Sequence, residues 1–191
     1  MESENIPPLF GKYDVGNLTI RDQGLANYMN LETRCIHQHA RHANRRFKKA
    51  NMSIIERLIN NMMRTERYTG KKTKAINIVR GAFDFIHDKK KGENPVQVFI
   101  QAIENSAPRE EITRLFLSGI HIPQAVDSSP LRRLDIALRN MSKGANSASL
   151  GSKKRIEQCL AEEIMKAAED DPNSFAVAKK GEVERIAKSA R

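Results

Sequence analysis

Apolar residues recur at helical spacing in six separate segments of the chain, and a single intervening stretch breaks that pattern. The spacing predicts helices over 53–67, 73–88, 94–107, 129–141, 153–169 and 179–190. Residues 112–126, ITRLFLSGIHIPQAV, are instead rich in β-branched and aromatic residues around Ser118-Gly119, a dipeptide suited to a two-residue turn, which predicts a β-hairpin. The expected fold is mainly α: a single helical-bundle domain of about six helices with a protruding β-hairpin arm and an irregular N-terminal leader.

Several of these helices begin at residues typical of helix starts. Ser53 and Glu56 form a capping-box pattern, in which each side chain can bind a free backbone N–H group. Asn94 and Ser129 are each followed by proline, which suits the first helical turn because its missing N–H has no partner there. Residues 142–152 are polar, contain two glycines, and are interpreted as a loop.

The N-terminal quarter of the chain differs from the rest. Residues 1–33 show no sustained period, and residues 34–50, RCIHQHARHANRRFKKA, are strongly basic and weakly apolar. We therefore divide the chain into a leader and basic arm, 1–50, and a helical domain, 51–191, with its hairpin at about 112–126.

The positive charge is concentrated in one third of the chain. The net charge is +10, yet residues 34–91 alone hold 16 Lys and Arg against four Asp and Glu. Such a concentration favours a polyanionic partner, nucleic acid first and an acidic membrane surface second, over an ordinary basic protein. No apolar run approaches a membrane span, no signal peptide is recognisable, and the two cysteines, Cys35 and Cys159, are isolated. A cytosolic protein is expected.

Patterns that could indicate catalysis or a cofactor are incomplete. Cys35, His37, His39 and His42 do not follow a common zinc spacing and lack a second ligand pair, so a basic arm is favoured over a metal site. The segment 70–73, GKKT, lacks the earlier glycine and the preceding strand of a nucleotide-binding loop. We expect no enzyme activity, no metal and no cofactor.

Acidic residues on the predicted helices do not form a catalytic pair. Glu162-Glu163 and Glu182 with Glu184 are interpreted as solvated faces, or as partners of Lys166 and Arg185.

Four basic groups remain as candidate RNA contacts. They are Arg41, Arg45, Arg46, Lys48 and Lys49 on the arm; Lys71, Lys72 and Lys74; Arg132, Arg133 and Arg139; and Lys153, Lys154 and Arg155. Such side chains neutralise phosphates and release counterions. Few aromatic residues are available to stack on bases, the candidates being Tyr13, Tyr28, Phe47 and Tyr68. Recognition of the backbone and shape of folded RNA is therefore favoured over single-strand stacking.

Five sequence blocks, in the same order as in the family, resemble the universal S-seven family of small-subunit ribosomal proteins in its archaeal and eukaryotic branch. They are RRFKKANMSIIERLINNMM (45–63), GKKTKAINIV (70–79), GENPVQVFIQAIENSAPREE (92–111), QAVDSSPLRRLDIALRNM (124–141) and SFAVAKKGEVERIAKSAR (174–191). The resemblance runs from about Tyr13 to Arg191. It implies a structural protein that binds the head (3′ major domain) of small-subunit rRNA, supports head assembly, and lies near the mRNA exit and the exit-site tRNA.

The resemblance also implies partners and sites. The partners would be small-subunit rRNA and neighbouring small-subunit ribosomal proteins, with mRNA and exit-site tRNA nearby and with neither membrane nor DNA. Its rRNA contacts would include Arg45, Arg46, Lys48, Lys49, Lys71, Lys72, Lys74, Arg132 and Arg133. Its hairpin tip, here Leu117, Ser118, Gly119, Ile120 and His121, would point toward the exit site.

The hairpin departs from the family pattern. Family hairpins of this branch are usually glycine-rich and basic near the tip, whereas Arg114 is the only fixed positive charge close to this one. Apolar packing on a neighbour is thus favoured at the tip, although Arg114 stays a candidate rRNA contact.

Two other classes of protein fit the sequence less well. A DNA regulator would need a helix–turn–helix pair, and an RNA-processing enzyme would need a catalytic constellation; the sequence displays neither.

Overall fold

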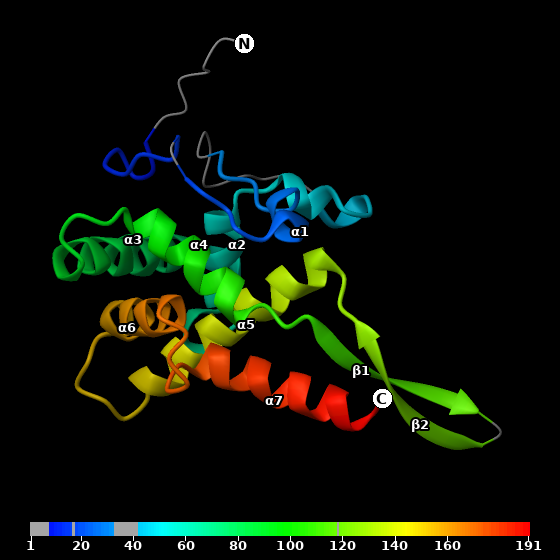
Figure 1. Ribbon diagram of the computed structural model, residues 1–191. Helices are drawn as coiled ribbons and strands as arrows, with labels where there is room; N and C mark the ends of the chain where they lie inside the picture. The colour runs from blue at the N-terminus through cyan, green and yellow to red at the C-terminus, as the bar shows by residue number, and fades with distance from the viewer. Residues whose placement is uncertain (1–7, 17, 33–41, 118) are drawn as a thin grey trace, which may run out of the picture.

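The computed structural model describes residues 8–16, 18–32, 42–117 and 119–191. In this part of the chain the fold is mainly helical with one β-hairpin, as predicted (Figure 1). The α-helices are α1 (Gln23–Ala26), α2 (Ile54–Met62), α3 (Lys72–Lys89), α4 (Pro95–Ser106), α5 (Pro130–Ser149), α6 (Ile156–Ala168) and α7 (Phe175–Ser189). Short 3₁₀ turns occur at His42–Asn44, Lys48–Asn51 and Glu66–Tyr68. None of the helices in the described ranges is long and apolar enough to cross a membrane.

The core is a cluster of aliphatic side chains around two phenylalanines. Helix α6 packs against α3, α4 and α5, and α5 also contacts α2 and α7. Phe83 of α3 and Phe99 of α4 are fully buried, with their ring centroids 5.7 Å apart in an edge-to-face arrangement. This geometry is favoured between aromatic rings, so the pair fixes the contact between α3 and α4.

The N-terminal segment, 8–32, covers part of this core. It supplies buried side chains that sequence periodicity did not predict: Leu9, Tyr13, Val15, Leu25 and Met29. Polar contacts hold the segment in place, since the Tyr13 hydroxyl donates to Asp84 Oδ1 at 2.6 Å and Asn94 Nδ2 donates to the Asp14 carbonyl at 2.6 Å. Tyr13 is therefore a core residue and not an exposed platform for base stacking.

The β-hairpin projects from the helical body, as Figure 1 shows. Strands β1 (Glu110–Leu117) and β2 (Ile120–Asp127) are antiparallel, with Glu110 opposite Asp127 and Leu117 opposite Ile120. Gly119 has φ +87°, a value that glycine adopts without the steric cost other residues bear. The predicted hairpin is confirmed and extends about two residues further at its base. Helix α7 packs against that base.

Helix α5 is longer than predicted. It begins after Ser129 as expected, although the Ser129 side chain makes no capping hydrogen bond. Residues 142–149, interpreted as loop, continue the helix. The Ser142 hydroxyl donates to the Leu138 carbonyl at 2.9 Å, one turn back, and Ala145 is fully buried. Tertiary packing of this last part thus outweighs its weak helix propensity.

Helix α7 begins at Phe175, four residues before the predicted start at 179. Its first turn is bound by Glu163 of α6, whose Oε1 accepts from the Ser174 hydroxyl at 2.8 Å and from the Ala176 N–H at 2.9 Å. Glu163 is buried and serves as an acceptor for a helix start. Its predicted role as a solvated residue or as a partner of Lys166 or Arg185 is wrong.

The predicted capping box at α2 is also wrong. The Ser53 side chain is buried and makes no capping hydrogen bond, while Glu56 Oε1 accepts from Lys72 Nζ at 2.6 Å. Helix α2 ends at Met62, earlier than predicted. By contrast, Asn94 does cap α4, because its side chain accepts from the backbone N–H of Val96.

Gly144 lies where α5, α6 and α7 meet, and a larger residue there is expected to destabilise the fold. An added Cβ would lie 2.8 Å from Phe175 Cβ and 3.1 Å from Glu163 Cδ. Although alanine favours helix over glycine, Gly144→Ala should lower the free energy of unfolding by about 1–3 kcal/mol, measured by urea denaturation. The control is Gly181→Ala in α7, where no atom lies within 4 Å, which should stabilise slightly. Equal effects of the two substitutions would contradict this packing.

Candidate nucleic-acid interface

The arm preceding α2 presents positive charge and one exposed ring. Arg45, Arg46 and Lys48 are exposed, whereas Arg41 lies outside the described residues. Phe47 is 52% exposed, and the Arg46 guanidinium carbon lies 5.0 Å from the centre of its ring. An exposed aromatic side chain beside an arginine can stack on a nucleic-acid base. The cysteine and two of the histidines weighed as zinc ligands, Cys35, His37 and His39, also lie outside the described residues.

Lys49 connects this arm to α5. Lys49 Nζ and Arg57 Nη2 both donate to the Asp135 carboxylate, the second at 2.9 Å, and the Arg57 side chain is only 4% exposed. Burial raises the pKa of Asp135, but the hydrogen bonds from Lys49 and Arg57 outweigh it and hold that pKa below its usual value. The carboxylate therefore stays charged and neutralises part of the positive charge at this point.

The lysines at the start of α3 differ from one another. Lys72 is half-buried and pairs with Glu56, whereas Lys71 and Lys74 are exposed. Lys74 Nζ lies 5.2 Å from the centre of the Tyr68 ring, a cation–π distance. Lys71 and Lys74 can reach an external phosphate, while Lys72 already has an internal partner.

Arg132 and Arg133 are neighbours in sequence with opposite environments. Arg133 is buried, with Nε donating to the Pro108 carbonyl at 3.2 Å and Nη2 to Asp22 Oδ2 at 2.8 Å. Desolvation raises the pKa of Asp22, but the hydrogen bond from Arg133 outweighs it and holds that pKa below its usual value. The Arg132 side chain is 64% exposed and pairs with Glu111 at 2.7 Å. Of these two arginines, only Arg132 faces solvent.

This difference gives a prediction about stability. Arg133→Gln should lower the free energy of unfolding by about 2 kcal/mol, because it leaves the half-buried Asp22 carboxylate without its charged donor. Arg132→Gln should change it by less than about 1 kcal/mol, since exposed ion pairs contribute little. Thermal and urea unfolding of the two variants, followed by circular dichroism, measure this; equal losses would contradict a structural role for Arg133.

Arg139 belongs to a group of cations that the sequence analysis did not predict to lie together. Two adjoining hollows, of about 660 and 280 Å³, share Asn61, Arg64 and Arg139 between the end of α2 and α5. The larger hollow is also lined by Arg67 and Lys143, and the smaller by Lys49. We call the surface formed by Lys49, Arg64, Arg67, Arg139 and Lys143 the basic groove.

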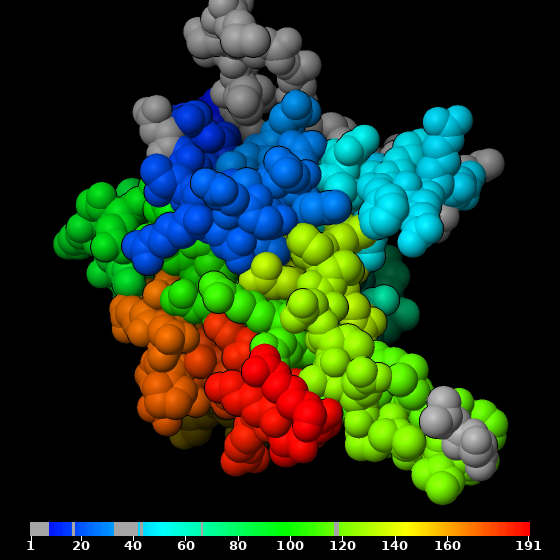
Figure 2. All heavy atoms as spheres, turned by 45° about the vertical axis from the view of Figure 1, so that its right-hand side comes forward, coloured from blue at the N-terminus to red at the C-terminus, as the bar shows by residue number. Residues whose placement is uncertain are grey.

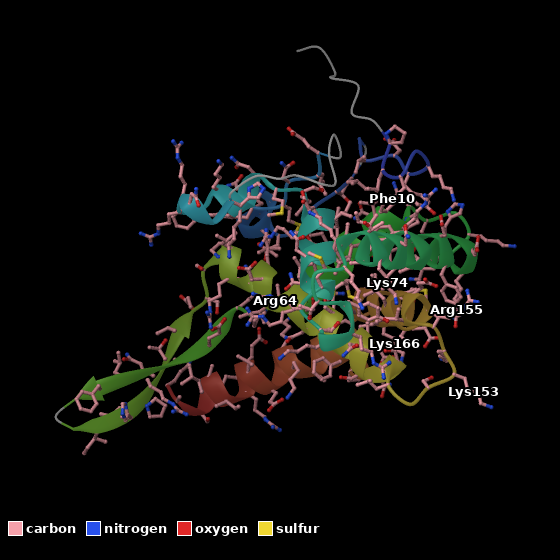
Figure 3. All side chains as sticks on the ribbon, turned by 180° about the vertical axis from the view of Figure 1, so that it is seen from behind. Phe10, Arg64, Lys74, Lys153, Arg155 and Lys166 are labelled. Atoms are coloured by element: carbon pink, nitrogen blue, oxygen red, sulfur yellow. The ribbon has the colours of Figure 1, made fainter. Side chains whose placement is uncertain are left out.

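Figures 2 and 3 show the parts of the molecule that surround the smaller hollow and Arg64. Figure 2 shows a recess between the segment around residues 42–51, in cyan, and the projecting hairpin, with α2 in teal behind it. In Figure 3, Arg64 lies on the side nearer to the hairpin. Arg64, Arg67, Arg139 and Lys143 are exposed and form no ion pair with any acidic side chain that the structure describes. Their positive charge is therefore available to an external anion.

Sequence reasoning missed Arg64, Arg67 and Lys143, although a signal was present. Arg139 and Lys143 are four residues apart, the spacing that puts side chains on one face of a helix, and Arg64 and Arg67 follow the end of α2 closely. The meeting of the two pairs could not be deduced, because it depends on how α2 packs against α5.

The remaining candidates follow the end of α5 and lie away from Arg64. Lys153 and Arg155 are exposed, and Figure 3 places both far from Arg64. Lys154 Nζ, between them, donates to Glu162 at 2.8 Å. The four predicted basic groups therefore do not form one continuous face.

The hairpin presents mainly apolar side chains. Phe116 and Ile120 are 67% and 66% exposed, and the Phe116 ring centroid lies 5.1 Å from that of His121. Arg114, exposed on β1 opposite Pro123, is available for an anion. Among the predicted tip residues, Gly119, Ile120 and His121 are exposed and Ser118 is outside the described residues; Leu117 pairs with Ile120 through its backbone.

The exposed basic surfaces have the chemistry of a binding site for anions. Exposed guanidinium and ammonium groups without acidic partners attract phosphates and release counterions. Within the residues described, no cluster of three or more His, Cys, Asp or Glu could hold a metal ion.

Comparison with known proteins agrees with the family resemblance of the sequence. The family model described as ribosomal protein S7p/S5e matches residues 26–191. "Small ribosomal subunit protein uS7" of Thermoplasma volcanium is 52% identical over 184 residues, which cover 96% of this chain and 100% of that protein. The uS7 proteins of Picrophilus torridus and Archaeoglobus fulgidus are each 53% identical, over 96% of this chain and over 98% and 94% of their own lengths. The chain therefore belongs to the ribosomal protein S7p/S5e family.

Proposed function

We propose that the chain binds small-subunit rRNA through the basic groove and the exposed arm, as a structural constituent of the small ribosomal subunit. Membership of the family makes it a ribosomal, non-enzymatic protein of that subunit. One observation supports this mode of binding. Four cations line the larger hollow without a described acidic side chain as partner: Arg64, Arg67, Arg139 and Lys143.

The shape of this surface favours folded RNA over a single strand. The arm and the hairpin both project from the helical body, so an RNA helix or junction could contact one of them while its phosphates meet the basic groove. Arg45, Arg46 and Lys48 on the arm and Arg132 near the base of the hairpin would add phosphate contacts. Lys71, Lys74, Lys153 and Arg155 lie outside the basic groove and would reach other RNA segments. Lys49, Lys72, Arg133 and Lys154, which have internal partners, would help mainly by holding the surface in place.

The place within the subunit follows from the family resemblance. We propose that the RNA is the head, or 3′ major domain, of small-subunit rRNA, and that the protein supports head assembly in the cytoplasm. Its hairpin tip would lie near the mRNA exit and exit-site tRNA. The exposed Phe116 and Ile120 favour contact of the tip with a neighbouring ribosomal protein, and Arg114 would supply a phosphate contact below the tip.

Crosslinking in native lysate tests this proposal. The protein is irradiated in place, purified under denaturing conditions, and its attached RNA is sequenced. Crosslinks concentrated in the head of small-subunit rRNA, with peptides from the arm and from α5, are expected. Crosslinks spread over messengers, or recovery of DNA, would contradict the proposal. Co-sedimentation with small subunits through sucrose in moderate salt separates specific assembly from loose binding to polyanions.

A further inference from the structure

The larger hollow of the basic groove contains groups that a phosphate alone would not use. Its volume is about 660 Å³, within the range of about 300–1,000 Å³ usual for sites that enclose a small ligand. Besides the four cations it is lined by Asn61, Asn146 and Leu150. We call this hollow the α5 pocket, because most of its lining residues lie on α5 or directly follow it.

Asn146 presents an unused hydrogen-bonding group in the α5 pocket. Its side-chain Oδ1 is buried and accepts no hydrogen bond from the residues the structure describes. The local helix end does not need this group, since the Asn146 backbone carbonyl already accepts from the Leu150 N–H and from the Ser149 hydroxyl. Buried acceptors without partners are uncommon in proteins. Asn146 also lines the open hollow, so a rotation of its amide would bring this acceptor to a partner from outside the chain.

Leu150 adds an apolar wall to the same pocket. It follows the last residue of α5, and its side chain is 50% exposed. A flat aromatic group placed against Leu150 would remove apolar surface from water, while an amide can both donate to and accept from a polar edge. The pocket therefore combines an apolar wall, an amide and a ring of cations.

We propose that the α5 pocket receives the base of an unpaired rRNA nucleotide, whose flanking phosphates are bound by Arg64, Arg67 and Lys143. The inference rests on the proposed rRNA-binding function and adds to it the kind of RNA element recognised. An intact duplex would offer mainly phosphates and sugars to this side of the protein. It would leave Leu150 in water and Asn146 without a partner. A base turned out of its helix satisfies all three kinds of group at once.

Binding to a transcript of the head domain of archaeal small-subunit rRNA tests the inference with full-length protein. Asn146→Leu keeps the size of the side chain and suits a helix, but it removes the amide; binding should weaken about tenfold. The slope of log affinity against log salt should stay unchanged, because no charge is lost. Leu150→Ser, at a position whose side chain is 50% exposed, should weaken binding about threefold. Ser147→Leu, one residue away and exposed, is the matched control and should bind as the parent chain does.

Chemical probing of the same RNA identifies the nucleotide. One base should react at its pairing edge in free RNA, be protected by the parent protein, and react again with Asn146→Leu. The inference fails if Asn146→Leu and Leu150→Ser both bind as the parent does while the parent binds well, a result that leaves the proposed function intact. Displacement of the RNA by micromolar adenosine or uridine monophosphate would assign the pocket to free nucleotides instead. Failure of the parent chain to bind the transcript would overturn the proposed function, and this inference with it.

Discussion

Reversing Arg64, Arg139 and Lys143 to Glu together is expected to weaken binding to small-subunit rRNA by at least about a hundredfold. The three cations line one hollow and have no acidic partners among the described residues, so each is free to neutralise a phosphate. Reversal removes those contacts and adds repulsion between the new carboxylates and the RNA. The slope of log affinity against log salt should also fall by about 2–3, because fewer counterions are released.

A matched control distinguishes the effect of the basic groove on RNA binding from the effect of total net charge. Arg80, Lys89 and Lys166 are exposed on α3 and α6, and reversing them changes the net charge by the same amount. If the basic groove is the site, this control should weaken binding several-fold at most. Equal weakening by both triple variants, measured by filter binding at several salt concentrations, would show that only the total charge matters. Thermal unfolding of each variant verifies that the fold is intact.

Truncating Phe83 to Ala should produce the largest loss of stability. Phe83 is fully buried and packs against Phe99 at 5.7 Å and Phe10 at 6.3 Å between ring centroids. The substitution leaves a cavity where the N-terminal segment, α3 and α4 meet. A loss of about 3–5 kcal/mol in the free energy of unfolding is expected, a large part of the total for a domain of this size.

Phe116→Ala is the control for this truncation. Phe116 is 67% exposed near the tip of the hairpin, so the same chemical change should alter the free energy of unfolding by less than about 1 kcal/mol. Urea denaturation monitored by circular dichroism compares the two variants. Similar losses for both would mean that the hairpin, and not the contact between α3 and α4, limits stability.

The sequence predicts the elements of this fold better than the contacts between them. Periodicity located the long helices because each buries one face against the same core. The hairpin was predicted from its β-branched and aromatic residues around a Ser-Gly turn, although it projects into solvent. Periodicity failed at residues 142–149, where serines and a glycine suggest a loop. There the absence of a side chain at Gly144 lets α7 approach α5, and that packing maintains the helix. Such a contact depends on residues about thirty positions away and leaves no local signal.

The candidate site was predictable in its chemistry but not in its composition. Charge indicated an RNA-binding protein, and Arg139 was among the expected contacts. Charge alone could not distinguish Arg132 from Arg133. Arg133 is held inside the fold by its hydrogen bond to Asp22, which is more than a hundred residues away in the chain. Nor could charge alone assemble Arg64 and Lys143 around one pocket. Local sequence shows which side chains carry charge, and the packing of helices decides which of them face solvent together.

The exposed hairpin affects how readily copies of the free protein associate with one another. Within the described residues its sheet has only two strands, and it carries Leu115, Phe116, Ile120 and Ile122 in water. Free strand edges with apolar side chains promote self-association between copies of a chain. The net charge of +10 opposes this by mutual repulsion, but that repulsion is lost when a polyanion binds. The free protein is therefore expected to self-associate least at low concentration, and most readily once its charge is neutralised while the hairpin is still exposed.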